Sequence, residues 1–141
     1  MSVRFADVSV GTELPGQSFP LERADLVRYA GASGDFNPIH WSERTATAVG
    51  LPDVIAHGML TMATAVRVVT DWLGDPGAVL DYKLRFTKPV VVAADSPAQL
   101  DVSAVVRAVD ASDRTAEIQL SASVAGQTVL TKARVRVRLA P

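Results

Sequence analysis

The apolar residues of this chain change their spacing about halfway along it, and this change limits the folds that the chain can adopt. From residue 58 to 73 apolar side chains recur every three to four positions and occupy nearly every side, which is typical of a buried helix. From about residue 100 onward apolar and polar side chains alternate, most clearly over 115–124 and 129–139, as in strands with one buried face. We therefore predict an α+β fold in which an antiparallel β-sheet wraps around a long central α-helix.

Shorter elements complete the predicted order. Apolar spacing indicates a first helix over 22–32, a short helix over 43–49 and an early strand over 78–87. Turn-forming residues at 110–113 and 125–127 join the later strands into an antiparallel meander. The chain has 141 residues and contains no repeat or linker, so we expect a single domain over 1–141.

The composition excludes several classes of function. The 14 basic and 15 acidic residues nearly cancel and form no block of like charge, so we expect no nucleic-acid partner and no membrane partner. There is no cysteine, which excludes disulfides, thiolate metal sites and cysteine nucleophiles. The first residues lack the apolar run of a signal peptide, and no stretch is apolar for long enough to span a membrane, so the expected location is cytoplasmic.

Residues 29–40 carry the clearest chemical signal and read Tyr-Ala-Gly-Ala-Ser-Gly-Asp-Phe-Asn-Pro-Ile-His. Asp35 and His40 lie on either side of Pro38, which prevents an ordinary helix from running through both, so the turning backbone can bring a carboxylate and an imidazole together. Such a pair can move protons. Downstream, Gly58 stands where the long helix is expected to begin, and a backbone N–H at that place favours a developing negative charge. An acid/base pair with an oxyanion donor suits chemistry beside a carbonyl group.

Taken singly, these residues also have structural interpretations. Asp35 could cap a turn, and His40 could be an ordinary loop histidine. His57 together with His40 could suggest a metal site, but two histidines without a third ligand at a familiar spacing make a poor one. We therefore expect a structural His57, no metal and no cofactor. Thr61 and Thr64 are expected to bond preceding helix carbonyls rather than to serve a site.

The run from Tyr29 to His40 resembles the hydratase 2 motif of the MaoC-like family. Members of this family are (R)-specific enoyl-thioester hydratases and (3R)-hydroxyacyl-thioester dehydratases on the hot dog fold. The Asp-x-Asn-Pro-Ile-His core of the motif is complete here, and Ala56-His57-Gly58-Met59 is similar to a second block of the family. The similarity extends over nearly the whole chain and includes dehydratases of type II fatty-acid synthesis. The reaction is named by this resemblance and not by the spacing of residues.

The resemblance implies roles for individual residues. Asp35 and His40 match the catalytic pair of the family, Gly58 matches its oxyanion-hole amide, and Asn37 matches a position that orders the loop. Glu43 is given no catalytic role. The family acts on acyl thioesters carried by acyl carrier protein or coenzyme A and works as dimers. The expected partner is therefore an identical chain or a second hot dog subunit.

These features together predict reversible elimination of water from a (3R)-hydroxyacyl thioester in type II fatty-acid synthesis. Two alternatives remain: an (R)-specific enoyl-CoA hydratase of β-oxidation or polyester supply, and a non-catalytic acyl-binding or structural hot dog subunit. The intact pair of Asp35 and His40 counts against the non-catalytic alternative. The alternating basic residues of the last strand are expected to form a solvated sheet face, and docking of an acidic carrier protein is a minor interpretation of them.

Overall fold

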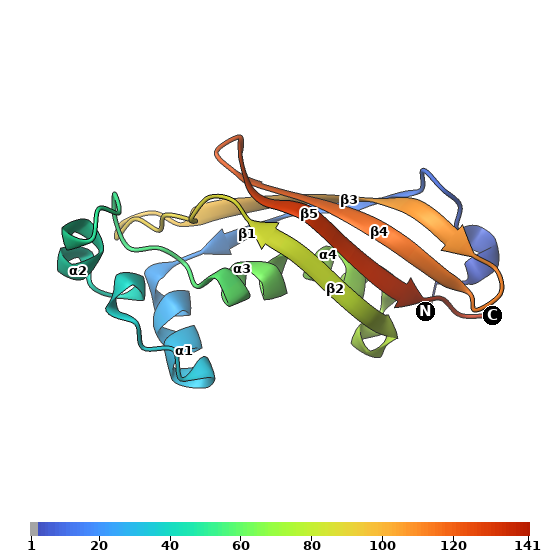
Figure 1. Cartoon of the computed structure of the whole chain (residues 1–141), viewed down its shortest axis with the longest axis horizontal. Coiled ribbons are helices and arrows are strands. Elements are labelled where there is room, and N and C mark those ends of the chain that lie inside the picture. The colour runs from blue at the N-terminus through green and yellow to red at the C-terminus, as the bar shows by residue number, and fades with distance from the viewer. Residues whose placement is uncertain (1–2) are drawn as a thin grey trace.

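Five antiparallel strands form one twisted sheet, and the main helices lie on one side of it (Figure 1). The computed structural model describes residues 3–141. The strands are β1 (Glu13–Leu21), β2 (Val79–Phe86), β3 (Ala98–Asp110), β4 (Thr115–Val124) and β5 (Gln127–Arg138), in the spatial order β1-β3-β4-β5-β2. The helices are α1 (Arg23–Ser33), α2 (Glu43–Ala48), α3 (Gly58–Ala65) and α4 (Arg67–Leu73), with short 3-10 turns η1 (Phe5–Asp7), η2 (Pro38–His40) and η3 (Pro76–Ala78). The predicted α+β hot dog architecture is confirmed, including the meander β3-β4-β5.

The alternation of side chains in β4 and β5 builds the core. Ile118 and Leu120 are buried on the side that faces the helices, while the charged residues between the apolar ones point to the other side. Val68 and Val69 of α4 are fully buried and belong to the same apolar cluster. Burying a side chain of this size contributes roughly 1.5–3 kcal/mol, so packing against the helices decides which face of the sheet turns inward.

The predicted continuous helix over 58–73 is wrong in two respects. It is divided at Val66 into α3 and α4, and Met59 is 57% exposed, so α3 is not buried on all sides. The Met62 carbonyl accepts the Val66 N–H at 3.3 Å and also the Tyr82 hydroxyl at 2.9 Å. This second donor, from strand β2, competes for the helical acceptor at the break. Apolar periodicity reports neither the competition nor the uncovered side.

Local signals set the ends of the shorter helices close to their predicted positions. Glu22 and Asp25 form a reciprocal capping box at the start of α1, and Gly34 ends this helix in the left-handed conformation with φ of 77°. Ser42 caps α2 through a hydrogen bond from the Thr45 N–H. Because Gly34 stops α1 abruptly, the chain turns away at residue 35.

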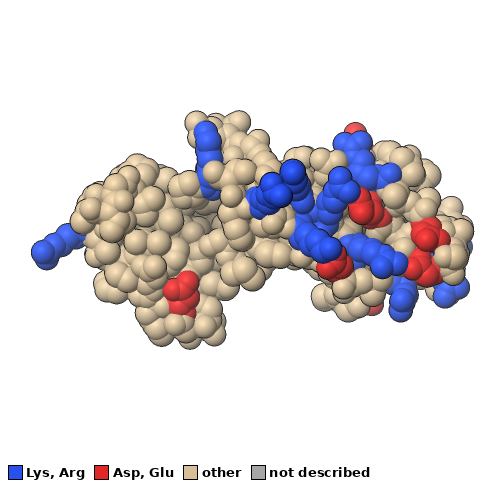
Figure 2. All heavy atoms as spheres, viewed as in Figure 1, with Lys and Arg blue, Asp and Glu red and all other residues tan. Residues whose placement is uncertain are grey.

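Basic side chains gather on the outer face of the sheet over β5 and β2, interleaved with acidic ones (Figure 2). Arg134 pairs with Glu117 at 2.9 Å, and Arg136 pairs with Asp113 at 2.6 Å. The solvated face predicted from the sequence is confirmed, and exposed pairs of this kind each contribute about 0–1 kcal/mol. Among the described residues, none of the helices is both long and apolar enough to cross a membrane.

Replacement of Tyr82 by Phe tests the link between the edge strand and the helix break. We expect Tyr82→Phe to lower the free energy of unfolding by about 1 kcal/mol at pH 7, because the hydrogen bond to Met62 is lost. Burial raises the pKa of the Tyr82 phenol above its ordinary value near 10. The folded state therefore holds the proton more tightly, and stability that is present below pH 10 is lost as the pH rises above it.

Denaturant titrations at pH 7 and between pH 9 and 11 measure both effects. The unfolding free energy of the wild type is expected to fall more steeply above pH 10 than that of Tyr82→Phe. Equal slopes for the two proteins would show that the phenol is not held in its protonated form by the fold.

Candidate active site

The loop between α1 and α2 is ordered by its own side chains. Asp35 Oδ1 accepts the Asn37 N–H at 3.1 Å, and Asn37 Oδ1 accepts the N–H of Ile39 at 3.2 Å. Pro38 begins the turn η2, whose last residue is His40. Two successive side-chain turns and a proline therefore curl the chain back, and they account for an ordering role of Asn37 in physical terms.

This loop brings Asp35 and His40 together, as the motif predicts. The distance from His40 Nε2 to Asp35 Oδ2 is 3.9 Å; the imidazole is buried and the carboxylate is 51% exposed. His40 Nδ1 lies 2.7 Å from the carbonyl oxygen of Ile55. A carbonyl can only accept, so Nδ1 carries a proton, and in the neutral form of the ring the lone pair is on Nε2, the atom that faces the carboxylate. The 3.9 Å gap is too long for a hydrogen bond but suits a water molecule bonded to both groups at about 2.8 Å.

His40 and Gly58 line one cavity of about 320 Å³. The other lining residues come from the loop before α3, from α3 itself, and from the segment that follows β2; they are Ile55, Ala56, Thr61, Phe86, Thr87, Lys88, Pro89, Val90 and Leu130. Asp35 does not line this cavity; its side chain contacts the region of His40 Nε2 from the exposed surface of the protein. No motif in the sequence marks residues 86–90 as part of the cavity wall. They line the cavity because β2 lies beside α3 in the folded chain.

Gly58 is the first residue of α3, so its N–H has no acceptor within the helix. Its φ is not in the left-handed region. A Cβ atom at this position would lie 3.1 Å from the ring of Phe86, which is closer than ordinary contact allows. Glycine is therefore needed here for close approach rather than for a special backbone turn.

His57 lies closer to the pair than the sequence indicates. Its ring stacks on that of His40 with centroids 3.7 Å apart and planes 21° apart, and its Nε2 lies 3.1 Å from the carbonyl oxygen of Asp35. Potential ligand atoms of the three residues fall within 4.8 Å of one another. Two nearly parallel rings at this separation cannot both point a lone pair at one ion, so the stacking opposes a shared metal. The adjacency of His57 and Gly58 in the sequence is the signal that could have indicated its place.

Thr61 and Thr64 behave as predicted. The Thr61 hydroxyl donates to the His57 carbonyl at 3.4 Å, and the Thr64 hydroxyl donates to the Leu60 carbonyl at 2.8 Å. Both are bonds to the preceding helical turn, and Thr61 is also one of the residues that line the cavity.

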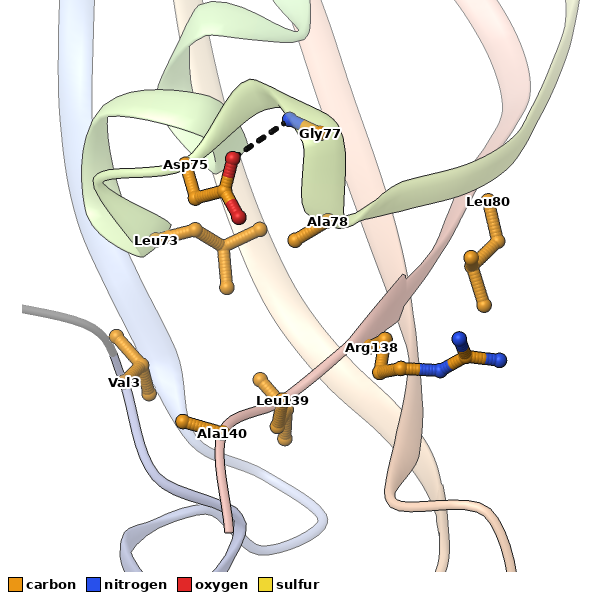
Figure 3. A pocket seen from close by; sticks show the side chains of 9 residues that line it. All are labelled: Val3, Leu73, Asp75, Gly77, Ala78, Leu80, Arg138, Leu139 and Ala140. Carbon is orange, nitrogen blue, oxygen red and sulfur yellow. Dashed lines mark hydrogen bonds between the residues drawn. The ribbon is translucent and has the colours of Figure 1, made fainter.

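A separate hollow of about 370 Å³ lies between the end of α4 and the end of β5 (Figure 3). Apolar side chains such as Leu73, Leu80 and Leu139 line it together with Asp75 and Arg138. Asp75 uses one carboxylate oxygen to accept the Gly77 N–H at 2.8 Å. No residue of the 29–40 motif lines this hollow, whereas His40 and Gly58 both line the cavity at the start of α3.

The chain is similar to several proteins that are named as dehydratases. The 3-hydroxybutyryl-CoA dehydratase of Methylorubrum extorquens is 31% identical over 128 residues, which cover 89% of this chain and 78% of that protein. The 3-hydroxyacyl-thioester dehydratase X of Mycobacterium tuberculosis is 38% identical over 80 residues, 57% of this chain but only 28% of that one. A solved MaoC-like dehydratase superposes with a TM-score of 0.96 at 42% identity, covering 99% of this chain and 43% of that chain.

The chain thus spans less than half the length of two of these relatives. Residues 4–128 match the family described as MaoC like domain, and this segment contains the loop with Asp35 and His40, the helix start at Gly58 and four of the five strands in full. The chain belongs to the MaoC-like domain family.

Proposed function

We propose that this chain catalyses the reversible addition of water to 2-enoyl thioesters, as a (3R)-hydroxyacyl-thioester dehydratase or (R)-specific enoyl-thioester hydratase. The observation that carries the proposal is the 3.9 Å gap between His40 Nε2 and Asp35 Oδ2, beside a cavity that also contains the free amide of Gly58. The names of the relatives from Methylorubrum extorquens and Mycobacterium tuberculosis support the same reaction class. We propose that the acyl group of the substrate is carried by the acyl carrier protein of type II fatty-acid synthesis, with coenzyme A as the alternative carrier.

In hydration, a water molecule lies between Asp35 and His40 while the thioester carbonyl points to the Gly58 N–H. Asp35 accepts one hydrogen bond from the water and orients it. The oxygen attacks C3 as His40 Nε2 takes the second proton, and the electron pair of the double bond moves through C2 onto the thioester oxygen. The Gly58 amide stabilises this enolate oxygen, and general acid–base groups of this type contribute about 100- to 10,000-fold.

Return of the proton from His40 Nε2 to C2 completes the addition. The water has then supplied a hydroxyl to C3 and a hydrogen to C2, and both side chains are back in their starting state. Dehydration is the same sequence in reverse. The Nδ1–H bond to the Ile55 carbonyl keeps His40 in the tautomer that this sequence needs.

The purified protein is expected to convert crotonyl-CoA to the (3R)-hydroxy product, and Asp35→Asn and His40→Gln are each expected to lower this rate by about 100- to 10,000-fold. Asp35→Asn removes the negative charge that orients the water, and His40→Gln removes the Nε2 lone pair that takes its proton. Spectrophotometric assays and chiral chromatography of the released acid measure rate and stereochemistry. The matched control is Asp95→Asn, which removes an exposed carboxylate from the segment between β2 and β3. Mainly (3S) product, or full activity of either site variant, would contradict the mechanism.

Gly58→Ala is expected to lower kcat by about 100-fold, the size of effect seen when an oxyanion-hole donor is lost. The added Cβ would enter the space beside the amide and press on Phe86. The double variant Gly58→Ala/Phe86→Ala removes the contact with the ring, and kcat is expected to stay low in it. Recovery of wild-type kcat in the double variant would show that the glycine serves only the packing of Phe86.

We further propose that the chain works as a dimer with an identical chain or a second hot dog subunit. Met59 of α3 is 57% exposed, Phe86 of β2 is 53% exposed, and β2 is an edge strand bonded only to β5. An apolar surface beside an unpaired edge is the usual place for pairing with another subunit.

Native mass spectrometry is expected to give twice the 14.9 kDa chain mass, or the mass of a mixed pair. The substitution Met59→Lys is expected to shift the measured mass to that of the monomer. Isolation of the wild-type protein from its own cells as a monomer would overturn this proposal.

A further inference from the structure

His57 is sealed in the protein interior directly behind the proposed catalytic pair. Its side chain is 2% exposed, and its Nδ1 has no hydrogen-bond partner among the described residues and less than 1 Å² of accessible surface. Neither substrate nor solvent can reach this nitrogen. His57 therefore cannot exchange protons with a bound thioester, and any contribution to the reaction must pass through its neighbours.

The neighbours determine the tautomer of His57. Its Nε2 lies 3.1 Å from the Asp35 carbonyl oxygen, which can only accept, so the proton is on Nε2 and the unpartnered Nδ1 carries the lone pair. A charged ring would bury a second N–H with no acceptor. The pKa of His57 is lowered, because the effect of burial is larger than the opposite effect of the hydrogen bond to the Asp35 carbonyl. The titratable groups that face it are Asp35, His40 and Tyr29, whose ring meets it edge to face at 4.7 Å.

The neutral ring touches both members of the pair at once. Its face covers the face of His40 at 3.7 Å, while its N–H holds the backbone from which the Asp35 carboxylate projects. The Ile55 carbonyl holds the His40 ring by its edge. Edge and face together leave this imidazole little freedom to rotate, and the Asp35 backbone is tied to the same support.

We propose that His57 is a positioning residue that sets the spacing between Asp35 and His40, holding the 3.9 Å gap in which the water fits. This inference rests on the proposed hydratase function. The stack fixes His40, the Nε2–H bond fixes Asp35, and the Tyr29 edge fixes His57 itself. A displacement of about 1 Å in such a pair can cost about 100-fold in rate.

Two substitutions separate the two contacts. His57→Phe keeps a flat ring for the stack and removes the N–H, whereas His57→Gln keeps an N–H donor at the corresponding place and removes the ring. Each is expected to lower kcat for crotonyl-CoA hydration by about 10- to 100-fold with KM changed by less than about threefold. The control for loss of stability is Tyr82→Phe, which is expected to be destabilised while keeping wild-type kcat.

A combined variant tests whether the effect passes through His40. If it does, adding His57→Gln, which removes the stacked ring and keeps an N–H donor for the Asp35 carbonyl, to His40→Gln is expected to lower the rate no further than His40→Gln alone. A multiplied loss in the double variant, or wild-type kcat in both single variants, would overturn the proposal.

A spectroscopic readout distinguishes failure of this inference from failure of the proposed function. Nitrogen-15 NMR of the imidazoles is expected to show His57 neutral with the proton on Nε2 at pH 7, and a protected His40 Nδ1–H signal that is lost in His57→Gln, where the stacked ring is missing, and kept in His57→Phe. An unchanged His40 signal in folded His57→Gln would refute positioning, whether or not the protein is active. Absence of hydration by a wild type with the expected spectra would refute the hydratase function and, with it, any role of His57 in that reaction.

Discussion

The apolar face of the sheet has to be covered, and α3 and α4 cover it. Val68 and Val69 pack into the same cluster as Ile118 and Leu120, and this burial sets the helix axis relative to the strands. The start of α3 is thereby held beside β2, with Gly58 against Phe86. Because the position of Gly58 follows from packing along α3 and α4, the proposed oxyanion donor is placed by the same hydrophobic contacts that stabilise the domain.

The second part of the site is held by hydrogen bonds rather than by apolar packing. The loop from Gly34 to His40 is short of apolar contacts, and its shape comes from the side-chain bonds of Asp35 and Asn37 and from the 2.7 Å bond of His40 to the Ile55 carbonyl. This last bond connects the loop to the segment that leads into α3. The proposed acid/base pair and the proposed oxyanion donor are therefore joined through residues 55–58, and His57 lies within that segment.

Much of the fold could be read from local patterns. The period-two alternation identified the buried faces of β4 and of β5 from Ala133 onward, since side chains of a regular strand alternate. Near the start of β5 the alternation is interrupted: Val129 and Leu130 are both buried, and Lys132 has a φ of 49°. The helix over 58–73 was assigned the right residues and the wrong continuity, because the break at Val66 depends on a hydroxyl from β2, which is distant in sequence. The sequence shows that α3 is apolar on nearly every side, but not which of its side chains meet the core and which, like Met59, are left exposed.

The sequence by itself determined most of the elements, the inward face of the alternating strands, and the turn that brings Asp35 toward His40, because these depend on side chains within a few residues of one another. The tertiary structure alone decided the 3.9 Å gap, the burial of His57 and its stack on His40, and the lining of the cavity by residues 86–90. Each of these joins segments separated by many residues. Their distances are set by how β2 and α3 pack together and by backbone carbonyls whose acceptor role no residue type reveals.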